Sequence, residues 1–170
     1  MLNVPSVSVK IDLASLAAAR MIGKGETGAV SFDAKVKLEE RERKSQMVVV
    51  GFNLLLTTKP GIVKFEIEGT ATLTGKDEEI RKVLEVEPET RVPHVLRRIY
   101  QHAFTAMYLM STMLNVPPPP QDLLYPDEQG GLPEGVSVEV GAEKAEAAEG
   151  VTIMADTRTK EPGETNTINK

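Results

Sequence analysis

Three consecutive stretches of the chain place apolar residues at every second position, and this pattern constrains the fold more than any other feature. The first spans Val30 to Leu38, the second is MVVVGFNLLLTT at residues 47–58, and the third spans Val63 to Leu73. A period of two predicts β-strands. The middle stretch is apolar on both of its faces, so we expect a central strand that is covered, at least in part, on both sides.

The N-terminal stretch is ambiguous between strand and helix. Apolar residues alternate from Val7 to Leu13, whereas LASLAAARM at residues 13–21 has good helix propensity. We expect a long strand with a β-bulge near Ala14. The sheet would then consist of four strands that all precede the helices.

Two helical patterns follow the strands. Asp77 can cap a short helix, and a long helix is expected from about Pro93 to Leu114. The apolar positions of the long helix cover well over half of its circumference, which is more than the stripe of about 100° that covers one sheet. We therefore expect a second apolar neighbour, most simply another subunit, although the whole arc could instead lie within one core. In the first case the oligomer interface contains Ile99, Ala103, Ala106, Met107 and Met110.

The long helix stops at NVPPPPQDLLY, residues 115–125. Proline lacks the N–H that a helix needs and disfavours helical geometry in the preceding residue, so the prolines at 117–120 end the helix and form a stiff, extended spacer. This spacer delivers Leu123, Leu124 and Tyr125 to a fixed place. They could line a binding surface, or the leucines could simply plug the edge of the core.

The acidity of the chain is concentrated after Pro126. Residues 127–170 carry ten acids and four bases, a net charge of −6, whereas residues 1–126 have a net charge of +1. The segment contains no Phe, Tyr or Trp, and this composition offers little apolar surface to offset the entropy of ordering. We therefore predict a domain over residues 1–126 and a mostly disordered tail over 127–170, in which SVEV and VTIM are candidates for weak strands.

Several classes of function find no support in the sequence. There is no cysteine, no stretch of eighteen uninterrupted apolar residues, and no basic segment before an apolar one at the start, so we expect a cytoplasmic protein without stable membrane insertion. No basic patch with interleaved aromatic residues favours nucleic-acid binding.

The GKGETG motif at 23–28 precedes a strand instead of opening a helix, which argues against a nucleotide site. His94 and His102 lack partners at metal-ligand spacing. We expect no metal, no cofactor and no enzymatic activity.

The order of these elements resembles that of the SecB protein-export chaperone family. The resemblance is carried by the strand pattern, by FEIEGTATLTG at 65–75 and by residues 92–125, whose Asn115, Pro118 and Asp122 match the linker that follows the long helix in that family. It implies a two-layer α+β fold with a four-stranded antiparallel sheet in the order 1-4-3-2, followed by a long helix and a short C-terminal segment. It also implies a homotetramer built as a dimer of dimers. Pro126 comes almost at once, so a second helix should be short or missing.

Two functions from different classes remain. The first, which the resemblance implies, is an ATP-independent holdase chaperone that binds extended apolar segments of unfolded polypeptides, with protein export as one setting. The second is an adaptor of the same fold that binds one dedicated folded partner. For the holdase we expect a peptide groove between the loop at 23–28, the second face of the central strand and the segment after the prolines. Its expected lining residues are Met47, Val49, Leu55, Leu123, Leu124 and Tyr125.

Overall fold

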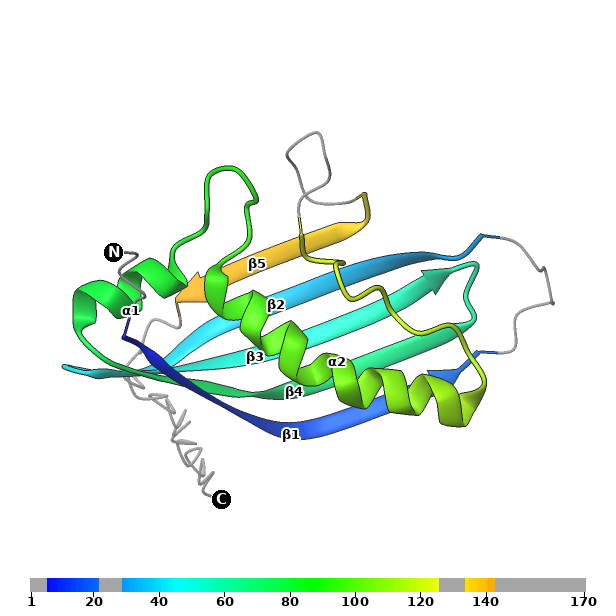
Figure 1. The fold of residues 1–170 in the computed structure, drawn as a ribbon, viewed down its shortest axis with the longest axis horizontal. Helices are drawn as coiled ribbons and strands as arrows, with labels where there is room; N and C mark the ends of the chain where they lie inside the picture. Colours follow the sequence, from blue (N-terminus) through cyan, green and yellow to red (C-terminus); the bar gives the residue numbers. More distant parts are fainter. Residues whose placement is uncertain (1–5, 22–28, 126–133, 143–170) are drawn as a thin grey trace, which may run out of the picture.

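A computed structural model describes residues 6–21, 29–125 and 134–142. In this part of the chain, one sheet carries a long helix and an extended segment on one of its faces (Figure 1). The elements in chain order are β1 (Ser8–Arg20), β2 (Ser31–Lys44), β3 (Met47–Lys59), β4 (Val63–Thr74), α1 (Asp77–Leu84), α2 (His94–Leu114) and β5 (Val136–Ala142).

The sheet has the strand order β1-β4-β3-β2-β5. The four long strands pair antiparallel, so the predicted α+β fold and the predicted order 1-4-3-2 are confirmed. The register of β1 against β4 shifts between Leu13 and Ser15, which places the expected bulge at Ala14. The bulge lets β1 remain a strand through LASLAAAR, because strand pairing along β4 outweighs the helix propensity of its alanines.

The core lies on the face of the sheet that α2 covers. Cross-strand partners such as Leu54 and Ile67, or Leu56 and Phe65, point to this face and are fully buried. The helix places Leu96, Ile99, Tyr100, Ala103 and Met107 against them. The predicted alternation along the strands therefore corresponds to one buried face, which is called the helix face below. The opposite face is called the open face.

The short helix α1 begins one residue earlier than the capping prediction requires. Lys76 is the N-cap and its side chain makes no capping hydrogen bond, while Asp77 is the first residue of the helix. The expected capping role of Asp77 is therefore wrong. Its carboxylate instead forms ion pairs with Arg43 and Arg81, which keeps a negative charge in the first turn, where the helix dipole favours it.

The sheet contains a strand beyond the four that were expected. Residues 136–142 form β5, which pairs parallel with β2 and includes the SVEV stretch that was a candidate for a weak strand. This segment carries few large apolar groups, but β2 would otherwise present a row of unpaired N–H and C=O groups at the sheet edge. Pairing those groups stabilises a segment whose composition alone predicts disorder. VTIM and the rest of residues 143–170 lie outside the described residues, and for them the tail stays a prediction.

Gly69 gives a direct test of this packing, because it faces the β1 bulge. A Cβ at Gly69 would meet the backbone carbonyl oxygen of Asp12 and would lie 2.7 Å from the Phe52 ring. We predict that Gly69→Ala lowers the free energy of unfolding by about 1–3 kcal/mol, the usual cost of overpacking a core. Gly141→Ala is the control, because its Cβ would find its nearest neighbours at 3.8 and 4.0 Å. Urea denaturation of the two variants should separate them, and equal stability would contradict the register.

Candidate binding surfaces

A narrow apolar strip, interrupted at its middle, lies on the open face. It consists of Met47 and Val49 at one end of β3 and Leu55 farther along, all of them half-buried, with Gly51 and Asn53 between them. Leu55 lies between Lys35 of β2 and Glu66 of β4, so charged neighbours flank this leucine on both sides. A hollow of about 160 Å³ opens beside it. Its lining residues are Lys35, Val36, Lys37, Asn53, Leu55, Ser137 and Glu139. The strip can make limited apolar contact with a partner, while the surrounding groups offer hydrogen bonds and charge.

The segment after the prolines completes the core. Asn115 adopts a left-handed conformation and ends α2, and the chain then turns back across the sheet (Figure 1). Leu123 and Leu124 are 6% and 1% exposed and belong to the same apolar core as the sheet residues. The interpretation of these leucines as a plug for the core therefore fits the structure of the single chain.

Polar contacts with α2 hold this segment in place. The Tyr100 hydroxyl donates a hydrogen bond to the carbonyl oxygen of Pro120. Burial, helped by the charge of Asp122, raises the pKa of Tyr100, so the hydroxyl keeps its proton and remains a donor. Gln101 donates to the Tyr125 hydroxyl at 3.1 Å, and the Arg97 guanidinium lies 5.3 Å from the centre of the Tyr125 ring. Tyr125 itself is 40% exposed and lies at the margin of the core.

The six expected peptide-binding residues therefore do not come together in one chain. Met47, Val49 and Leu55 point to the open face, whereas Leu123 and Leu124 lie in the core on the helix face. The periodicity of β3 predicted the first group correctly as off-face residues. Nothing local in DLLY shows to which face a loop returns, and that information was missing from the sequence. The glycine-rich loop at 23–28 lies outside the described residues.

The expected interface residues on α2 divide in a similar way. Ile99, Ala103 and Met107 are fully buried against the sheet of their own chain, while Ala106 and Met110 are partly exposed. The exposed apolar residues of the helix are instead Tyr108, Leu109 and Met113, at 51%, 58% and 84% exposure. The residues at the centre of the wide apolar arc pack against the sheet of the same chain. A second subunit could therefore contact only the residues at the two sides of the arc. If the centre of the arc had been assigned to the sheet, the sequence would have indicated Leu109 and Met113 as the interface residues.

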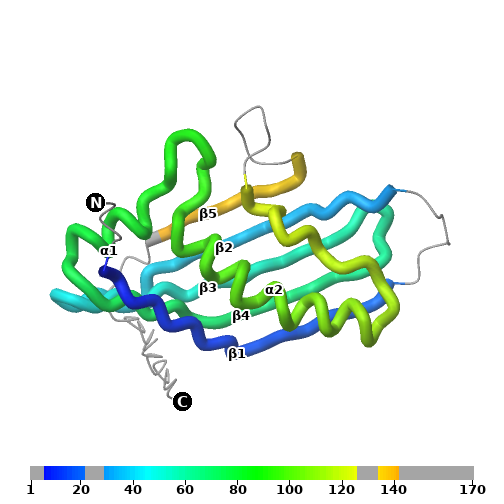
Figure 2. The backbone as a smooth tube through the Cα atoms, in the orientation of Figure 1, coloured from blue at the N-terminus to red at the C-terminus, as the bar shows by residue number. Residues whose placement is uncertain are grey.

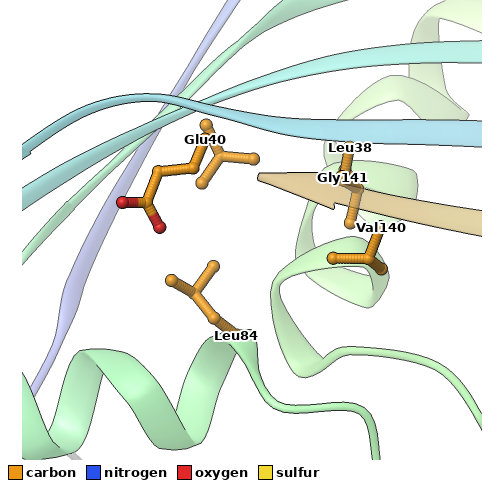
Figure 3. A pocket seen from close by; sticks show the side chains of 6 residues that line it. Leu38, Glu40, Leu84, Val140 and Gly141 are labelled. Atoms are coloured by element: carbon orange, nitrogen blue, oxygen red, sulfur yellow. The ribbon is translucent and has the colours of Figure 1, made fainter. Parts of the chain in front are cut away.

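A pocket of about 110 Å³ lies at the edge of the sheet where β5 ends. We call it the edge pocket. Its walls are Leu38 and Glu40 of β2, Val50 of β3, Leu84 of α1, and Val140 and Gly141 of β5. Figure 3 shows the apolar side chains of Leu38, Leu84 and Val140 around the cavity, with the Glu40 carboxylate at one side. The sequence did not predict this pocket, although the alternating valines of VSVEV were a signal for one of its walls.

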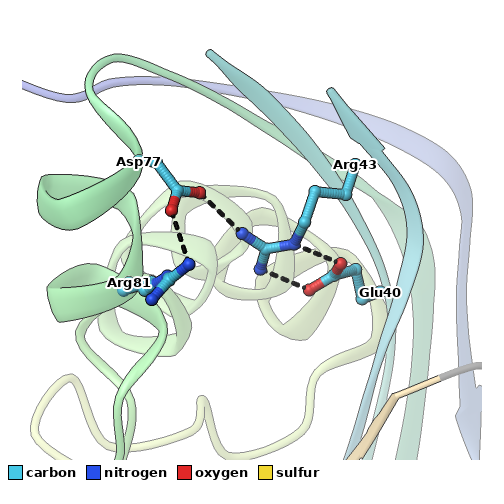
Figure 4. A network of polar contacts seen from close by, with 4 residues as sticks. All are labelled: Glu40, Arg43, Asp77 and Arg81. Carbon is cyan, nitrogen blue, oxygen red and sulfur yellow. Dashed lines mark hydrogen bonds and ion pairs between the residues drawn. The ribbon is translucent and has the colours of Figure 1, made fainter. Parts of the chain in front are cut away.

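Glu40, which lines the edge pocket, also belongs to an ion-pair network with Arg43, Asp77 and Arg81 (Figure 4). Arg43 donates to both carboxylate oxygens of Glu40 at 2.7 Å and to Asp77 at 3.0 Å, and Arg81 lies 2.8 Å from the second oxygen of Asp77. The hydrogen bonds from Arg43, together with its charge, lower the pKa of Glu40 against the opposing effect of burial. The network thus ties the end of β2 to the first turn of α1.

Other kinds of site find little support in the described ranges. His94 lies 2.9 Å from Glu87, but no group of three His, Cys, Asp or Glu side chains is arranged to hold a metal ion in residues 6–21, 29–125 and 134–142. None of the helices within those ranges is long and apolar enough to cross a membrane.

Comparison with solved structures identifies the fold as SecB-like. The chain superimposes on the Mycobacterium tuberculosis Rv1957 SecB-like chaperone, solved in complex with a ChAD peptide from the HigA1 antitoxin, with a TM-score of 0.50 and 14% identity over 66% of this chain and 87% of that one. A protein of unknown function from Streptococcus agalactiae aligns with a TM-score of 0.37 and 14% identity over 67% and 96% of the two chains. No family profile matches the sequence, and no curated protein matches it. The likeness to Rv1957 shows a common fold.

The ion-pair network predicts how stability responds to acid. A carboxyl whose folded pKa is lowered stabilises the protein above its ordinary value of 4.5, and this contribution is lost as the pH falls through the lowered value. Glu40→Gln should therefore be less stable than wild type at pH 7, and the gap in unfolding free energy should shrink as the pH falls below 4.5. Glu42→Gln is the control, because that side chain is 48% exposed. Urea titrations at several pH values would show a constant gap if the account were wrong.

Proposed function

We propose that this protein is an ATP-independent holdase that binds extended apolar segments of unfolded polypeptides in the cytoplasm. The observation that carries the proposal is the edge pocket of a SecB-like sheet, where apolar side chains lie beside the backbone of a strand edge. The fold supports it further, because Rv1957 is a SecB-like chaperone that was solved with a bound peptide. Export substrates are one client class that fits such an activity.

This function follows from two general interactions. Backbone hydrogen bonds at a strand edge bind any extended chain, and pockets for alternate side chains favour apolar ones. Neither interaction depends on a particular client sequence, and neither needs a nucleophile, a metal or a cofactor. A surface of this kind can therefore serve many unfolded chains.

The residues expected to line one groove form two separate groups in this proposal, one on the open face and one in the segment after the prolines. Met47, Val49 and Leu55 form an accessory apolar contact on the open face. Leu123 and Leu124 contact a client only when their segment leaves the core, which requires loss of the Tyr100, Gln101 and Arg97 contacts, whereas Tyr125 is already exposed at the margin. We propose the open-face strip as the more accessible of the two surfaces.

One observation favours the adaptor as a second candidate. The edge pocket of the single chain holds about 110 Å³, which is small for several side chains of an extended client. A dedicated folded partner could use the strip and the exposed residues of α2 without any movement. Client range separates the two functions, since a holdase accepts unrelated unfolded proteins.

Oligomerisation is the next part of the proposal. We propose a homotetramer, a dimer of dimers, in which the margins of α2 lie at an interface through Leu109 and Met113. These side chains are exposed, so Leu109→Asp combined with Met113→Asp should dissociate the assembly without unfolding the chain. Thr105→Asp adds a charge at another exposed position of the same helix and should leave the mass unchanged. Light scattering at micromolar concentration measures the mass, and a wild-type monomer would overturn the proposal. Met107→Asp is unsuitable here, because Met107 is buried within its own chain.

Holdase activity predicts that the full chain suppresses aggregation of two unrelated, reduced and unfolded proteins in the absence of ATP. Val49→Thr combined with Leu55→Asn should weaken this effect, because both changes remove apolar area from the open-face strip. Thr57→Asn lies on the same face and strand and serves as the matched control. Light scattering of the client solution over time gives the measurement.

Two outcomes would argue against parts of this account. Failure of the wild-type chain to suppress aggregation of either client would favour the adaptor. If the double variant suppresses client aggregation as well as wild type does, with its oligomeric mass unchanged, the strip is not part of the client-binding surface. The edge pocket would then be the remaining candidate.

A further inference from the structure

The strand β5 is joined to the sheet along one edge. It pairs parallel with β2, from Ala34 opposite Val136 to Glu40 opposite Ala142, and the Ala34 N–H donates to the Gly135 carbonyl oxygen at 3.0 Å. In the described part of the chain, β5 is the last strand of the sheet and has no partner on its other side. Each long strand β2, β3 and β4 has two neighbours, so β5 and β1 are the edges.

The extent of its pairing shows that β5 is held less firmly than β1. Its pairing covers 7 residues, whereas β1 has 13 residues along β4 and α2 lies against it. Val136 and Val138 are only half-buried, and Val140 is 54% exposed. Parallel pairing is also slightly weaker per residue than antiparallel pairing. The free energy that holds β5 against β2 is therefore small compared with that of the other strands.

The side chains of β5 define the chemistry that suits this edge. Its valines alternate on the helix face, opposite Ala34, Val36 and Leu38 of β2. Ser137 and Glu139 alternate on the open face, where Glu139 lies opposite Lys37 and helps to raise the pKa of that lysine, after the larger effect of Glu39. The edge thus fits an extended segment with apolar residues at every second position and neutral or acidic residues between them.

One part of the edge remains unfilled when β5 is in place. The edge pocket lies beside Val140 and Gly141, and both residues are too small to fill it (Figure 3). A leucine or phenylalanine at the position of Val140 would reach Leu38 and Leu84 and bury more apolar area. An external segment with such a residue therefore has an energetic advantage over β5, while β5 has the advantage of belonging to the same chain.

We propose that β5 is an internal ligand, which occupies the edge of β2 where an extended apolar client segment pairs in parallel, and which the client displaces. This inference rests on the proposed holdase function and assigns its client site to the β2 edge. It also explains how the chain avoids exposing a free strand edge when no client is present. If β5 is docked in about 90% of molecules, undocking it should raise the apparent affinity for clients about tenfold.

A reversible covalent lock tests the displacement. Lys35 and Ser137 are exposed register partners, and neighbouring strands lie about 4.8 Å apart, within the Cα range of a disulfide. The chain has no cysteine, so Lys35→Cys combined with Ser137→Cys introduces the only thiols. The oxidised protein should bind unfolded client at least about tenfold more weakly than the same protein after reduction. Equal binding by the oxidised and reduced forms would overturn the proposal.

A second variant works in the opposite direction. Gly135 has a φ of +90°, and a Cβ there would clash with the Asp33 carboxylate, which Lys59 holds at 2.6 Å. Gly135→Val should therefore release β5 without altering β2. It should bind a labelled peptide of residues 134–142 more tightly than wild type does, and more tightly still when the peptide carries Leu in place of Val140. Thr105→Val, which places a valine at an exposed position of α2 away from the β2 edge, should behave as wild type. Fluorescence anisotropy gives the affinities, after circular dichroism and light scattering confirm the fold and mass.

The two probes separate this inference from the proposed function. Client binding that is identical in wild type and Gly135→Val, with no binding of the 134–142 peptide, would overturn the inference and leave the holdase intact. Peptide binding by Gly135→Val without client binding by any variant would support exchange at the β2 edge and overturn the holdase function. Enhanced binding of both probes supports both.

Discussion

The width of the sheet is the constraint on which this structure depends. Four strands at about 4.8 Å each span roughly 19 Å, whereas a helix with its side chains is only about 10–12 Å wide. The helix α2 crosses the sheet obliquely, with its closest backbone approach to β1 and β4, and cannot also cover all of the apolar residues of β3 and β2 (Figure 2). The prolines at 117–120 end the helix and direct the chain back across the sheet, so that Leu123 and Leu124 cover the apolar residues that α2 leaves exposed. A helix that continued beyond Asn115 would leave that part of the core exposed.

The same constraint explains where binding surfaces remain. Beyond the cover that α2 and DLLY provide, the described residues place α1 and β5 beside the end of β2, and the edge pocket lies between them. The ion pairs of Arg43 with Glu40 and Asp77 tie the end of β2 to α1, and they hold Glu40, the charged residue of the pocket wall, in place. The apolar edge of a SecB-like sheet is thus neither filled by its own side chains nor fully open to solvent. This arrangement suits a ligand that supplies its own backbone and one or two large apolar side chains.

The sequence was sufficient for the framework of the fold and insufficient for the surfaces. Alternation along β2, β3 and β4 predicted which residues face the core, and the resemblance to SecB predicted the order of the strands. The sequence did not show which face of α2 packs against the sheet, because a wide apolar arc does not reveal which of its residues lie at the centre of the contact. Met107 was therefore assigned to an interface, although it is buried in its own chain. The burial of Leu124 and the pairing of β5 depend on where the chain returns in space, and local composition contains no signal for that. The absence of aromatic residues from 127–170 even favoured disorder, since the pattern of β5 does not show the backbone groups of the β2 edge with which it pairs.

The central claim is that clients bind at the edge of β2, and amide hydrogen exchange with and without an unfolded client tests it most directly. The account predicts that client binding lowers the protection of residues 136–141, because β5 leaves the sheet, while amides of residues 34–40 stay protected, because the client replaces their partner. Residues 48–56, at the centre of the sheet, should not change and serve as the internal reference. Unchanged protection of β5 in the presence of saturating, bound client would contradict the account.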